Sequence, residues 1–420
     1  MKDTERKGRH HGPRESDRPV EDVADDPTPL QPPPRPLKGR GAVSNLQGRF
    51  ERDTREPFYD GWGELEALAP AEAPRREGND DTAAEAAPPR LITRVTQEQA
   101  RSILSRNSSP DIPFGVSLNP YRGCEHGCIY CFARPTHAYL DLSPGLDFET
   151  QLFAKTNAAE RLREALSRPS YRCEMIALGV NTDAYQPIER TQRITRGVLE
   201  VLHECHHPVA LITKSSLIER DIDLLAPMAA RRLAVAAVTI TTLDAEIART
   251  LEPRAATPSR RLRTIRTLSE AGIPVAVSVA PVIPFITEPD LERVLEAARE
   301  AGAVYANYIV LRLPWEVAPL FQQWLQAHFP DRAERVMNRV REMRGGKDYD
   351  SDFSTRMRGT GVWADLMRQR FHKAAERLGF RYHRFDLDTS QFVPPAPPVG
   401  SLRGARSGRK PDDDAQGSLF

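Results

Sequence analysis

Residues 259–280, SRRLRTIRTLSEAGIPVAVSVA, contain one helix and one strand of an alternating α/β chain. Apolar side chains recur at helical spacing through the first part, and the Ala271-Gly272 pair that follows is a usual helix stop. The remaining residues form a short apolar run rich in valine, which is typical of a buried strand. The same stop followed by a strand recurs at Ala301-Gly302. This alternation predicts parallel strands joined by right-handed helical crossovers.

Six such β–α pairs follow one another from Gly115 to about Phe329. We expect strands at 116–120, 175–181, 209–213, 233–241, 274–280 and 304–311. We expect the helices between and after them at 149–167, 191–206, 218–230, 259–271, 288–301 and 315–328. Six pairs are too few to close a standard eightfold barrel. The predicted fold class is therefore α/β, with a partial (β/α)6 TIM-like barrel over residues 95–329.

The flanks of this region have a different composition. The chain has 36 prolines, and the segments before Arg94 and after Phe392 are rich in them and lack periodicity. We expect a mostly disordered N-terminal region over 1–94, a short helical C-terminal extension over 330–392 and a disordered tail over 393–420. The helices of the extension are predicted at 331–344 and 361–378. An aromatic island at 45–62 either docks on the folded body or belongs to a linker.

Charge and composition narrow the class of protein. With 59 Lys and Arg against 58 Asp and Glu, the net charge of +1 gives no global attraction to nucleic acid or membrane, so any basic surface is local. No apolar run reaches the roughly 20 residues that span a bilayer. The N-terminus is too polar for a secretory signal, so we expect a cytoplasmic protein without membrane partners. Three of the 5 cysteines are clustered, which favours a metal site over disulfides.

The clustered cysteines follow the first predicted strand in the segment Pro120-Tyr-Arg-Gly-Cys124-Glu-His-Gly-Cys128-Ile-Tyr-Cys131. The spacing Cys-x3-Cys-x2-Cys, with two glycines in the loop, can wrap one compact soft-metal centre. A structural zinc site normally has four ligands, and an all-cysteine cubane needs a fourth cysteine. The other cysteines, Cys173 and Cys205, are far along the chain. Three ligands leave one iron of a cubane open for chemistry; zinc binding and a structural role for the cysteines are the alternatives.

This spacing, with the aromatic Tyr130 immediately before the third cysteine, resembles the signature of the radical S-adenosylmethionine (SAM) superfamily. The order of strand, cysteine loop and five further β–α units also matches that superfamily's partial barrel. The resemblance implies a [4Fe–4S] cluster on Cys124, Cys128 and Cys131, with SAM as the second cofactor. It further implies that the reduced cluster cleaves SAM to methionine and a 5′-deoxyadenosyl radical, with electrons from a donor such as flavodoxin or ferredoxin.

The carboxyl ends of the predicted strands supply the expected SAM pocket, because ligands of parallel α/β folds gather there. The residues at these ends are most similar to the spore photoproduct lyase and DNA-repair photolyase-like branch of the superfamily. That resemblance implies SAM contacts from Thr182, Lys214 and Thr239, with Asp183 beside them for the amino group. Helix capping is the alternative interpretation of Thr182 and Asp183. The expected cofactor-binding set is completed by Tyr130 and Ile283.

One position departs from that branch. Spore photoproduct lyases carry a hydrogen-donating cysteine just before the Thr/Ser-Asp element of the second strand, where this chain has Val180, which has no thiol. Repair of spore photoproduct itself is therefore in doubt, and a related subgroup is the better match. Its marks are Asp111-Ile-Pro-Phe, Cys131-Phe-Ala-Arg134-Pro-Thr-His137 and Thr182-Asp-Ala-Tyr185-Gln-Pro-Ile-Glu189. Tyr185 and Tyr139 are candidate radical relays, with packing at the barrel rim as the alternative.

Two features bear on the substrate and partners. A group of arginines in one strand-to-helix connection and its helix predicts either phosphate contacts or a solvated helix face: Arg249, Arg254, Arg260, Arg261, Arg263 and Arg266. The sequence Gln416-Gly-Ser-Leu-Phe420 resembles the short peptide by which bacterial replication and repair proteins bind the sliding clamp. We expect a lyase-like radical SAM enzyme that acts on a DNA lesion. The alternatives are a radical SAM enzyme for a small molecule or protein, and a non-catalytic metal-binding module at the clamp.

A chain truncated after Ala415 should lose its binding to the sliding clamp. The truncation removes the Gln and the Leu-Phe pair that are expected to enter a polar and an apolar pocket of the clamp. Surface plasmon resonance on immobilised clamp measures the effect. Equal binding by the truncated and the intact chain, or no binding by the intact chain, contradicts the clamp interpretation.

Overall fold

Parallel strands build the central sheet. The computed structural model describes residues 36–51, 91–381 and 386–396, all within the single compact unit Pro34–Phe420. The sheet has the strand order β10-β9-β8-β7-β6-β3-β2. Its parallel strands are β3 (Val116–Leu118), β6 (Ile176–Leu178), β7 (Val209–Thr213), β8 (Ala234–Thr239), β9 (Val275–Val282) and β10 (Tyr305–Val310). At one edge, β2 (Leu104–Arg106) pairs with β3 in the antiparallel direction.

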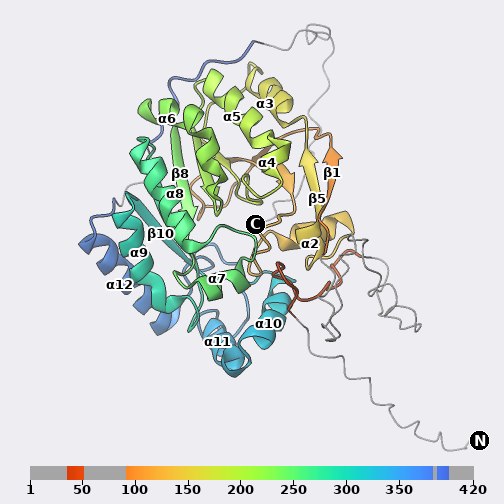
Figure 1. Ribbon diagram of the computed structural model, residues 1–420, viewed down its shortest axis with the longest axis vertical. Helices are drawn as coiled ribbons and strands as arrows, with labels where there is room; N and C mark the ends of the chain where they lie inside the picture. Colours follow the sequence, from red (N-terminus) through yellow and green to blue (C-terminus); the bar gives the residue numbers. More distant parts are fainter. Residues whose placement is uncertain (1–35, 52–90, 382–385, 397–420) are drawn as a thin grey trace, which may run out of the picture. The chain divides into compact units, whose positions relative to one another are not determined.

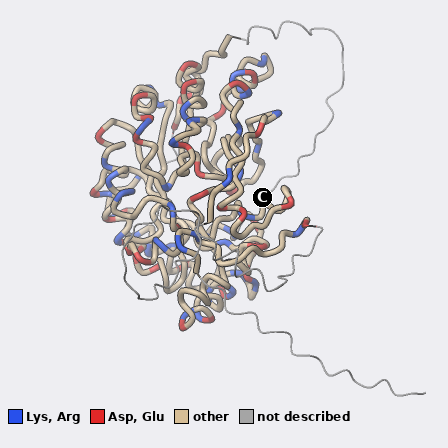
Figure 2. The backbone as a smooth tube through the Cα atoms, turned by 45° about the vertical axis from the view of Figure 1, so that its right-hand side comes forward, with Lys and Arg blue, Asp and Glu red and all other residues tan. Residues whose placement is uncertain are grey.

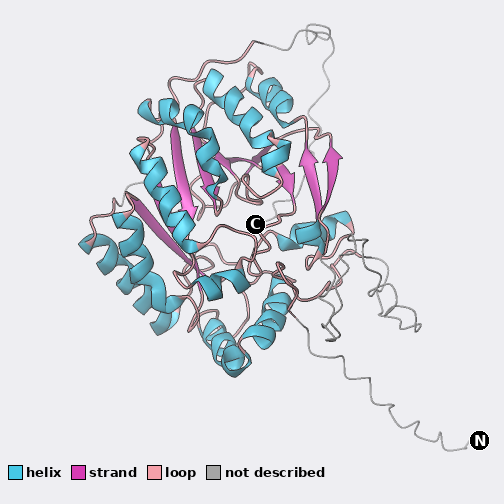
Figure 3. Ribbon diagram, viewed as in Figure 1, coloured by secondary structure: helices cyan, strands magenta, loops and turns pink. Residues whose placement is uncertain are grey.

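A long helix lies after each parallel strand and returns the chain to the next one. These helices are α3 (Ala158–Leu166), α5 (Ile194–Glu204), α6 (Ile222–Ala230), α8 (Pro258–Glu270), α9 (Leu291–Glu300) and α10 (Val317–His328). Figure 3 shows them outside the strands. Strands covered in this way carry almost uninterrupted apolar side chains, as in β9, where all but one residue is buried. The prediction of an α/β partial barrel is confirmed. Its first and last parallel strands, β3 and β10, lie towards opposite ends of the strand order and do not pair with each other.

Short helices occupy the connections between these elements. They are η1 (Arg134–Leu140), α2 (Asp147–Thr150), α4 (Glu189–Gln192), η2 (Ser216–Asp221), α7 (Ala245–Leu251) and η3 (Glu288–Asp290). Local sequence explains several starts: the Asp244 carboxylate accepts the amides of Glu246 and Ile247 at the beginning of α7. At the beginning of α8, the Thr257 hydroxyl accepts the amide of Arg260, and Pro258 occupies the first helical position.

A second, three-stranded sheet was not predicted. It has the order β1-β5-β4, with β1 (Arg94–Glu98), β5 (Gln151–Lys155) and β4 (Tyr121–Arg122). The helix expected at 149–167 is therefore wrong in its first half, and the true helix begins at Ala158. The reason is visible in the burial of β5, because Leu152 and Ala154 are buried while their neighbours are not, which is the two-residue period of a strand.

Residues 36–51 are ordered within the N-terminal region 1–94 that was expected to be mostly disordered. Ala42 is fully buried and Arg40 is 6% exposed, so this segment packs against the folded body. It contains the first part of the aromatic island, and the ring of Phe50 lies 4.8 Å from that of Tyr139. The rest of the island and the tail with the clamp-like peptide lie outside the described residues.

The C-terminal extension contains α11 (Pro330–Glu342) and α12 (Gly361–Arg377). The rings of Phe371 on α12 and Tyr308 on β10 lie 4.7 Å apart. Arg370 of α12 forms ion pairs with Glu288 and Glu292, which precede and begin α9. The extension is thus attached to the last units of the barrel. None of the helices in the described ranges is long and apolar enough to cross a membrane.

His207 lies at the amino end of β7, where the barrel is closed by packing. Its Nε2 atom is 2.7 Å from the Tyr171 hydroxyl, its Nδ1 atom is 3.0 Å from the Pro208 carbonyl oxygen, and its ring centroid is 5.2 Å from that of Phe392. Burial lowers the pKa of His207 from 6.5 to about 4. The ring is therefore neutral in the folded chain at neutral pH.

The free energy of unfolding should decrease as the pH falls from about 6.5 towards 4, because in this window the unfolded chain binds a proton at His207 that the folded chain does not. The full contribution is roughly 3 kcal/mol, since one pKa unit corresponds to about 1.4 kcal/mol. Urea unfolding at a series of pH values should show that His207→Gln removes this part of the pH dependence. The exposed His372→Gln variant is the control and should retain it. Parallel pH profiles for His207→Gln and the unaltered chain would show that the prediction is wrong.

Candidate functional site

The cysteine loop begins directly after β4 and is buried. Cys124 and Cys128 are each 7% exposed, Cys131 is half-buried, and all three thiols are free. The loop is held from two sides, because the Cys124 amide donates to the Phe148 carbonyl at 2.9 Å and the Ile129 amide donates to the Leu251 carbonyl at 3.1 Å. Burial, followed by the nearby charges of Asp183 and Cys128, raises the pKa of the Cys124 thiol. The loop therefore gathers three thiols in a dry environment.

Glycine is required at two positions of this loop. Gly123 and Gly127 have φ angles of 73° and 67°, a region that side-chain-bearing residues rarely adopt. A Cβ atom on Gly123 would lie 2.9 Å from the Phe148 carbonyl oxygen, and one on Gly127 would lie 2.7 Å from Glu149 Oε2. The spacing of the cysteines thus depends on close backbone approach as well as on the cysteines themselves.

A buried ion pair holds the backbone of the cysteine loop in place. Arg134, at the start of η1, is fully buried, and its Nη2 atom is 2.5 Å from Glu149 Oε1. The same guanidinium donates to the carbonyl oxygens of Cys128 at 2.9 Å and Gly127 at 3.1 Å. Its remaining nitrogen donates to the carbonyls of Pro144 and Gly145. One arginine therefore fixes the peptide groups on either side of the second cysteine to the segment that leads into α2.

A second polar network connects the loop to the ends of β6 and β7. Asp183 is 3.3 Å from His126 Nδ1 and accepts hydrogen bonds from the Lys214 amide at 2.7 Å and the Thr213 hydroxyl at 2.8 Å. Burial alone would raise the pKa of Asp183, but His126 and the backbone amides of Lys214 and Tyr185 outweigh it and lower the pKa to about 2. The carboxylate is ionised and its oxygens are occupied by protein donors. Asp183 thus positions the loop.

A third network lies on the opposite side of the loop. The Tyr130 hydroxyl donates to one oxygen of the buried Glu252, and Arg261 forms an ion pair with the other. The ammonium of Lys214 lies 5.7 Å from the centroid of the Tyr130 ring. Burial would raise the pKa of Glu252, but the charges of Arg261 and Lys214 lower it. Tyr130 is therefore fixed by its hydroxyl, with its ring beside the end of β7.

Comparison with known proteins places this geometry in a family. Residues 118–298 match the model of the radical SAM superfamily. An uncharacterized protein of Mycobacterium tuberculosis strain H37Rv is 39% identical over 234 residues, which cover 55% of this chain and 68% of that protein. The chain belongs to the radical SAM superfamily. An uncharacterized protein of Methanocaldococcus jannaschii is 24% identical over 224 residues, which cover 53% of this chain and 80% of the relative.

Among solved structures, spore photoproduct lyase complexed with dinucleoside spore photoproduct aligns with a TM-score of 0.45 and 12% sequence identity. The alignment covers 68% of this chain and 80% of that one. A cysteine-to-serine mutant of the same lyase aligns over the same shares of both chains, with the same TM-score and 13% identity.

The donor set fits the cluster of a radical SAM enzyme, whose cofactors are a [4Fe–4S] cluster and SAM. Cys124, Cys128 and Cys131 are the free thiols of one loop, and thiolates are the usual ligands of such clusters. In the part of the chain that the structure describes, no three His, Cys, Asp or Glu side chains converge on a single metal ion. Thiols that each bind a different iron of a cubane need no such convergence. Cys173 and Cys205 precede β6 and β7, at the opposite ends of these strands.

The residues predicted for SAM lie at one edge of the sheet. Thr182, Lys214 and Thr239 lie at the carboxyl ends of β6, β7 and β8, and Ile283 packs in the same apolar cluster as Cys128. The Thr182 hydroxyl donates to the Tyr121 carbonyl at 3.1 Å, and Thr239 is 4% exposed. These positions remain predictions for SAM contact. Asp183, by contrast, already has protein partners for both of its oxygens.

An unpartnered hydroxyl lies at the same edge. Thr241, two residues beyond Thr239, is 1% exposed, and its Oγ1 atom has no hydrogen-bond partner in the described structure. A buried hydroxyl without a partner is costly, so it is expected to meet a ligand group or water. Thr241 is not among the site residues predicted from the sequence, because only the fold shows that its hydroxyl is buried without a partner.

The two candidate radical relays have different surroundings. Tyr185 is 1% exposed within the main apolar core, and burial followed by the charge of Asp221 raises its pKa. Tyr139 is half-exposed and stacks against Phe50 of the N-terminal segment. The structure does not bring these tyrosines together, and their contacts are those of packing residues. A relay role remains a prediction.

The arginine group around α8 does not form a free basic patch. Arg260 pairs with Glu219 at 2.6 Å, Arg254 pairs with Glu125 at 2.9 Å, and Arg249 pairs with Glu246. Arg261 is buried against Glu252, as described above. Arg263 and Arg266 are exposed on the helix. Figure 2 shows acidic and basic positions interspersed along the chain, which favours the interpretation as a solvated helix face.

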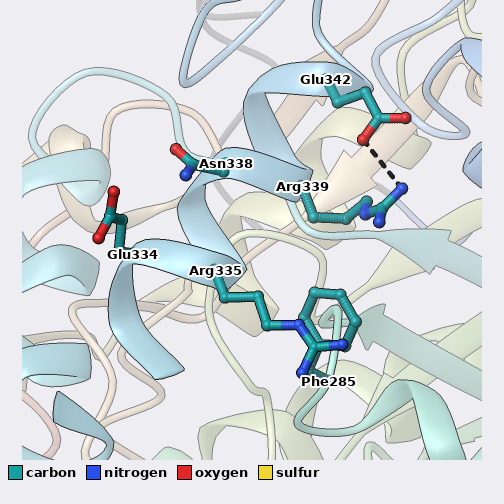
Figure 4. A pocket seen from close by; sticks show the side chains of 6 residues that line it. All are labelled: Phe285, Glu334, Arg335, Asn338, Arg339 and Glu342. Atoms are coloured by element: carbon teal, nitrogen blue, oxygen red, sulfur yellow. Dashed lines mark ion pairs between the residues drawn. The ribbon is translucent and has the colours of Figure 1, made fainter. Parts of the chain in front are cut away.

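A hollow beside α11 is lined by six residues: Phe285, Glu334, Arg335, Asn338, Arg339 and Glu342 (Figure 4). The guanidinium carbon of Arg335 lies 4.0 Å from the centroid of the Phe285 ring, and Arg339 pairs with Glu342 at 2.9 Å. The hollow contains none of the cysteines or strand-end residues. We therefore do not assign the reaction to it.

Arg134→Leu should destabilise the fold by about 3–5 kcal/mol, because it leaves the Glu149 carboxylate buried without its cation. It should also reduce the iron bound per chain, since the Gly127 and Cys128 carbonyls lose their donor. Guanidinium unfolding and iron analysis after anaerobic reconstitution measure the two effects. Arg163→Leu is the control, because it breaks only a surface pair with Glu204, worth about 0–1 kcal/mol. Similar losses in both variants would refute the role of Arg134.

Proposed function

We propose that this radical SAM enzyme acts on a lesion in nucleic acid and that the phosphate backbone of the substrate binds at the carboxyl end of β10. The observation that carries the proposal is a pair of arginines at this position, Arg312 and Arg344. Neither forms an ion pair with a carboxylate among the residues that the structure describes. By contrast, each of four other arginines described above pairs with a carboxylate: Arg134, Arg254, Arg260 and Arg261.

The surroundings of Arg312 connect it to the cysteine loop. Its guanidinium carbon lies 5.5 Å from the centroid of the Phe132 ring, and Phe132 directly follows Cys131. Its other contacts are neutral, namely the Tyr349 hydroxyl at 3.3 Å and the Met357 sulfur at 3.5 Å. Its Nε atom is buried without a partner. Arg312 therefore presents unused donors beside the third cysteine.

Arg344 reinforces the positive charge. It is 3% exposed and donates to the carbonyl oxygens of Leu311 and Thr355, both at 2.9 Å, while its Nε atom has no partner. Burial, followed by the like charge of Arg312, lowers the pKa of Arg344 to about 10. Two cations held together without an ion pair to a carboxylate in the described structure favour an anionic ligand. Phosphate matches the planar donor geometry of guanidinium groups.

Within this proposal, the residues at the barrel mouth, where the carboxyl ends of the parallel strands meet, have separate roles. Cys124, Cys128 and Cys131 would hold the cluster, which would supply the electron for reductive cleavage of SAM to a 5′-deoxyadenosyl radical once a small redox protein such as flavodoxin or ferredoxin had reduced it. The polar groups of SAM are held at the strand ends by Lys214, Thr182, Thr239 and Thr241. Its apolar part is lined by Tyr130 and Ile283. Because Val180 has no thiol, the proposal does not extend to spore photoproduct itself.

Anaerobic turnover of the reconstituted chain with dithionite tests this proposal. We expect 5′-deoxyadenosine by mass spectrometry, formed faster with irradiated DNA than with intact DNA or free nucleosides, and none with Cys128→Ala. Arg312→Gln should weaken DNA binding and reduce the slope of log K against log salt concentration by about one, the effect of losing one phosphate contact. Arg263→Gln, which changes an exposed arginine on α8, is the matched control.

Three outcomes would overturn the proposal. Formation of 5′-deoxyadenosine that no DNA stimulates points to a small-molecule or protein substrate. A reduced salt slope in Arg263→Gln but not in Arg312→Gln moves the phosphate contact to α8. Stoichiometric zinc without iron in anaerobically purified protein favours a non-catalytic module.

A further inference from the structure

We infer that residues 40–49, here called the strap, are a positioning element for the iron–sulfur cluster and close the open side of the partial barrel over it. The strap precedes the barrel by about 40 residues of sequence outside the described structure, yet it lies between α2 and α10 in Figure 1. The inference concerns the cluster and is independent of the proposed nucleic-acid substrate.

The first part of the strap holds the base of the cysteine loop. The amides of Gly41 and Ala42 donate to Glu149 Oε2 at 3.0 Å and to Oε1 at 2.8 Å. Arg40 donates to the Glu149 carbonyl oxygen at 3.0 Å. Glu149 pairs with Arg134, whose guanidinium holds the carbonyls of Gly127 and Cys128. A continuous series of buried polar contacts thus runs from the strap to the second cysteine.

The strap also touches the cysteine loop directly. A Cβ atom on Gly41 would lie 1.8 Å from the Gly127 carbonyl oxygen, a distance that no side chain can occupy. The φ angle of Gly41 is not in the positive range, so glycine is needed there for space rather than for conformation. Ala42 is fully buried in the same apolar cluster as Cys128 and Tyr130. The strap therefore covers the loop and keeps water from its inner side.

The second part of the strap reaches the last unit of the barrel. The Ser44 hydroxyl donates to Gln323 of α10 at 2.6 Å, and Arg49 pairs with Glu316 at 2.7 Å. The guanidinium carbon of Arg49 also lies 4.2 Å from the centroid of the Trp315 ring. Between these contacts, Asn45 exchanges two hydrogen bonds with Asp147 at the start of α2.

These contacts join elements that follow the first and the last parallel strand of the sheet, β3 and β10, which do not pair with each other. The cysteine loop and α2 follow β3, and α10 follows β10, and these two strands lie on opposite sides of the sheet. Because six strands do not close a barrel, a gap remains between the two ends of the sheet. By joining both ends, the strap restrains the loop and limits access to the cluster, and it should slow attack by oxygen.

Gly41→Ala tests the inference, because it adds one methyl group at the contact with Gly127. We expect the absorbance of the reconstituted cluster to decay in air about tenfold faster, which corresponds to about 1.4 kcal/mol of lost restraint. The electron paramagnetic resonance signal of the reduced cluster, with and without SAM, should also change shape. Gly197→Ala on α5 is the control: its φ angle is not positive, a Cβ atom there would meet only the Ala159 Cβ at 3.6 Å, an ordinary contact, and it should behave as the unaltered chain.

A decay rate and a resonance spectrum of folded Gly41→Ala that match those of Gly197→Ala and the unaltered chain would overturn the inference. A second measurement needs no variant. Coupling between two sites is reciprocal, so the loaded cluster must in turn stabilise the strap. Hydrogen exchange at the amides of Gly41 and Ala42 should therefore be at least about tenfold slower in cluster-loaded than in cluster-free protein, by the same free-energy conversion. Equal exchange rates in the two forms would equally exclude the positioning role.

Discussion

The ion pair between Arg134 and Glu149 is the constraint on which the cysteine loop depends. A loop that turns at two glycines of positive φ has no hydrogen-bond ladder of its own, so its carbonyl groups need donors from elsewhere. A guanidinium offers five N–H donors in one plane and serves several peptide groups at once. Its burial is tolerable only because a carboxylate pairs with it. Glu149 is in turn held by amides of the N-terminal strap, so three segments distant in sequence share one electrostatic centre.

The buried carboxylates of the barrel mouth follow the same rule, whereas two of its arginines do not. Asp183 is matched by His126 and backbone amides, and Glu252 is matched by Arg261 and Tyr130. Such satisfied networks hold a site in one geometry before any ligand binds. Arg312 and Arg344 differ, because their counter-charge is not supplied by the part of the protein that the structure describes. The contrast separates groups that build the site from groups that are left for a ligand.

The incomplete barrel explains why segments outside it matter. Six parallel strands gather their carboxyl ends at one edge but leave one side without a neighbour. In this protein the strap joins the unit after β3 to α10 at that side, and α12 packs on β10 and α9. The strap attaches through polar contacts of its side chains and backbone, whereas α12 attaches through apolar side chains and ion pairs. The cluster environment is therefore a property of the chain from residue 40 onwards, and the barrel alone does not complete it.

The sequence by itself determined the order of the barrel elements and the cysteine loop. Apolar periodicity identifies strands such as β9 and helices such as α8, and the Cys-x3-Cys-x2-Cys spacing is local, so both can be read from neighbouring residues. Only the tertiary structure decided which charges meet. Chain turns whose geometry no short pattern encodes form the ion pairs of Arg134 with Glu149 and of Arg261 with Glu252. They also bring the Arg312 guanidinium to the ring of Phe132. Docking of the aromatic island at 45–62 was one of two interpretations of the sequence, but the contacts of Gly41 and Ala42 with Glu149 could not be predicted, because they are made by backbone amides, which every residue except proline carries.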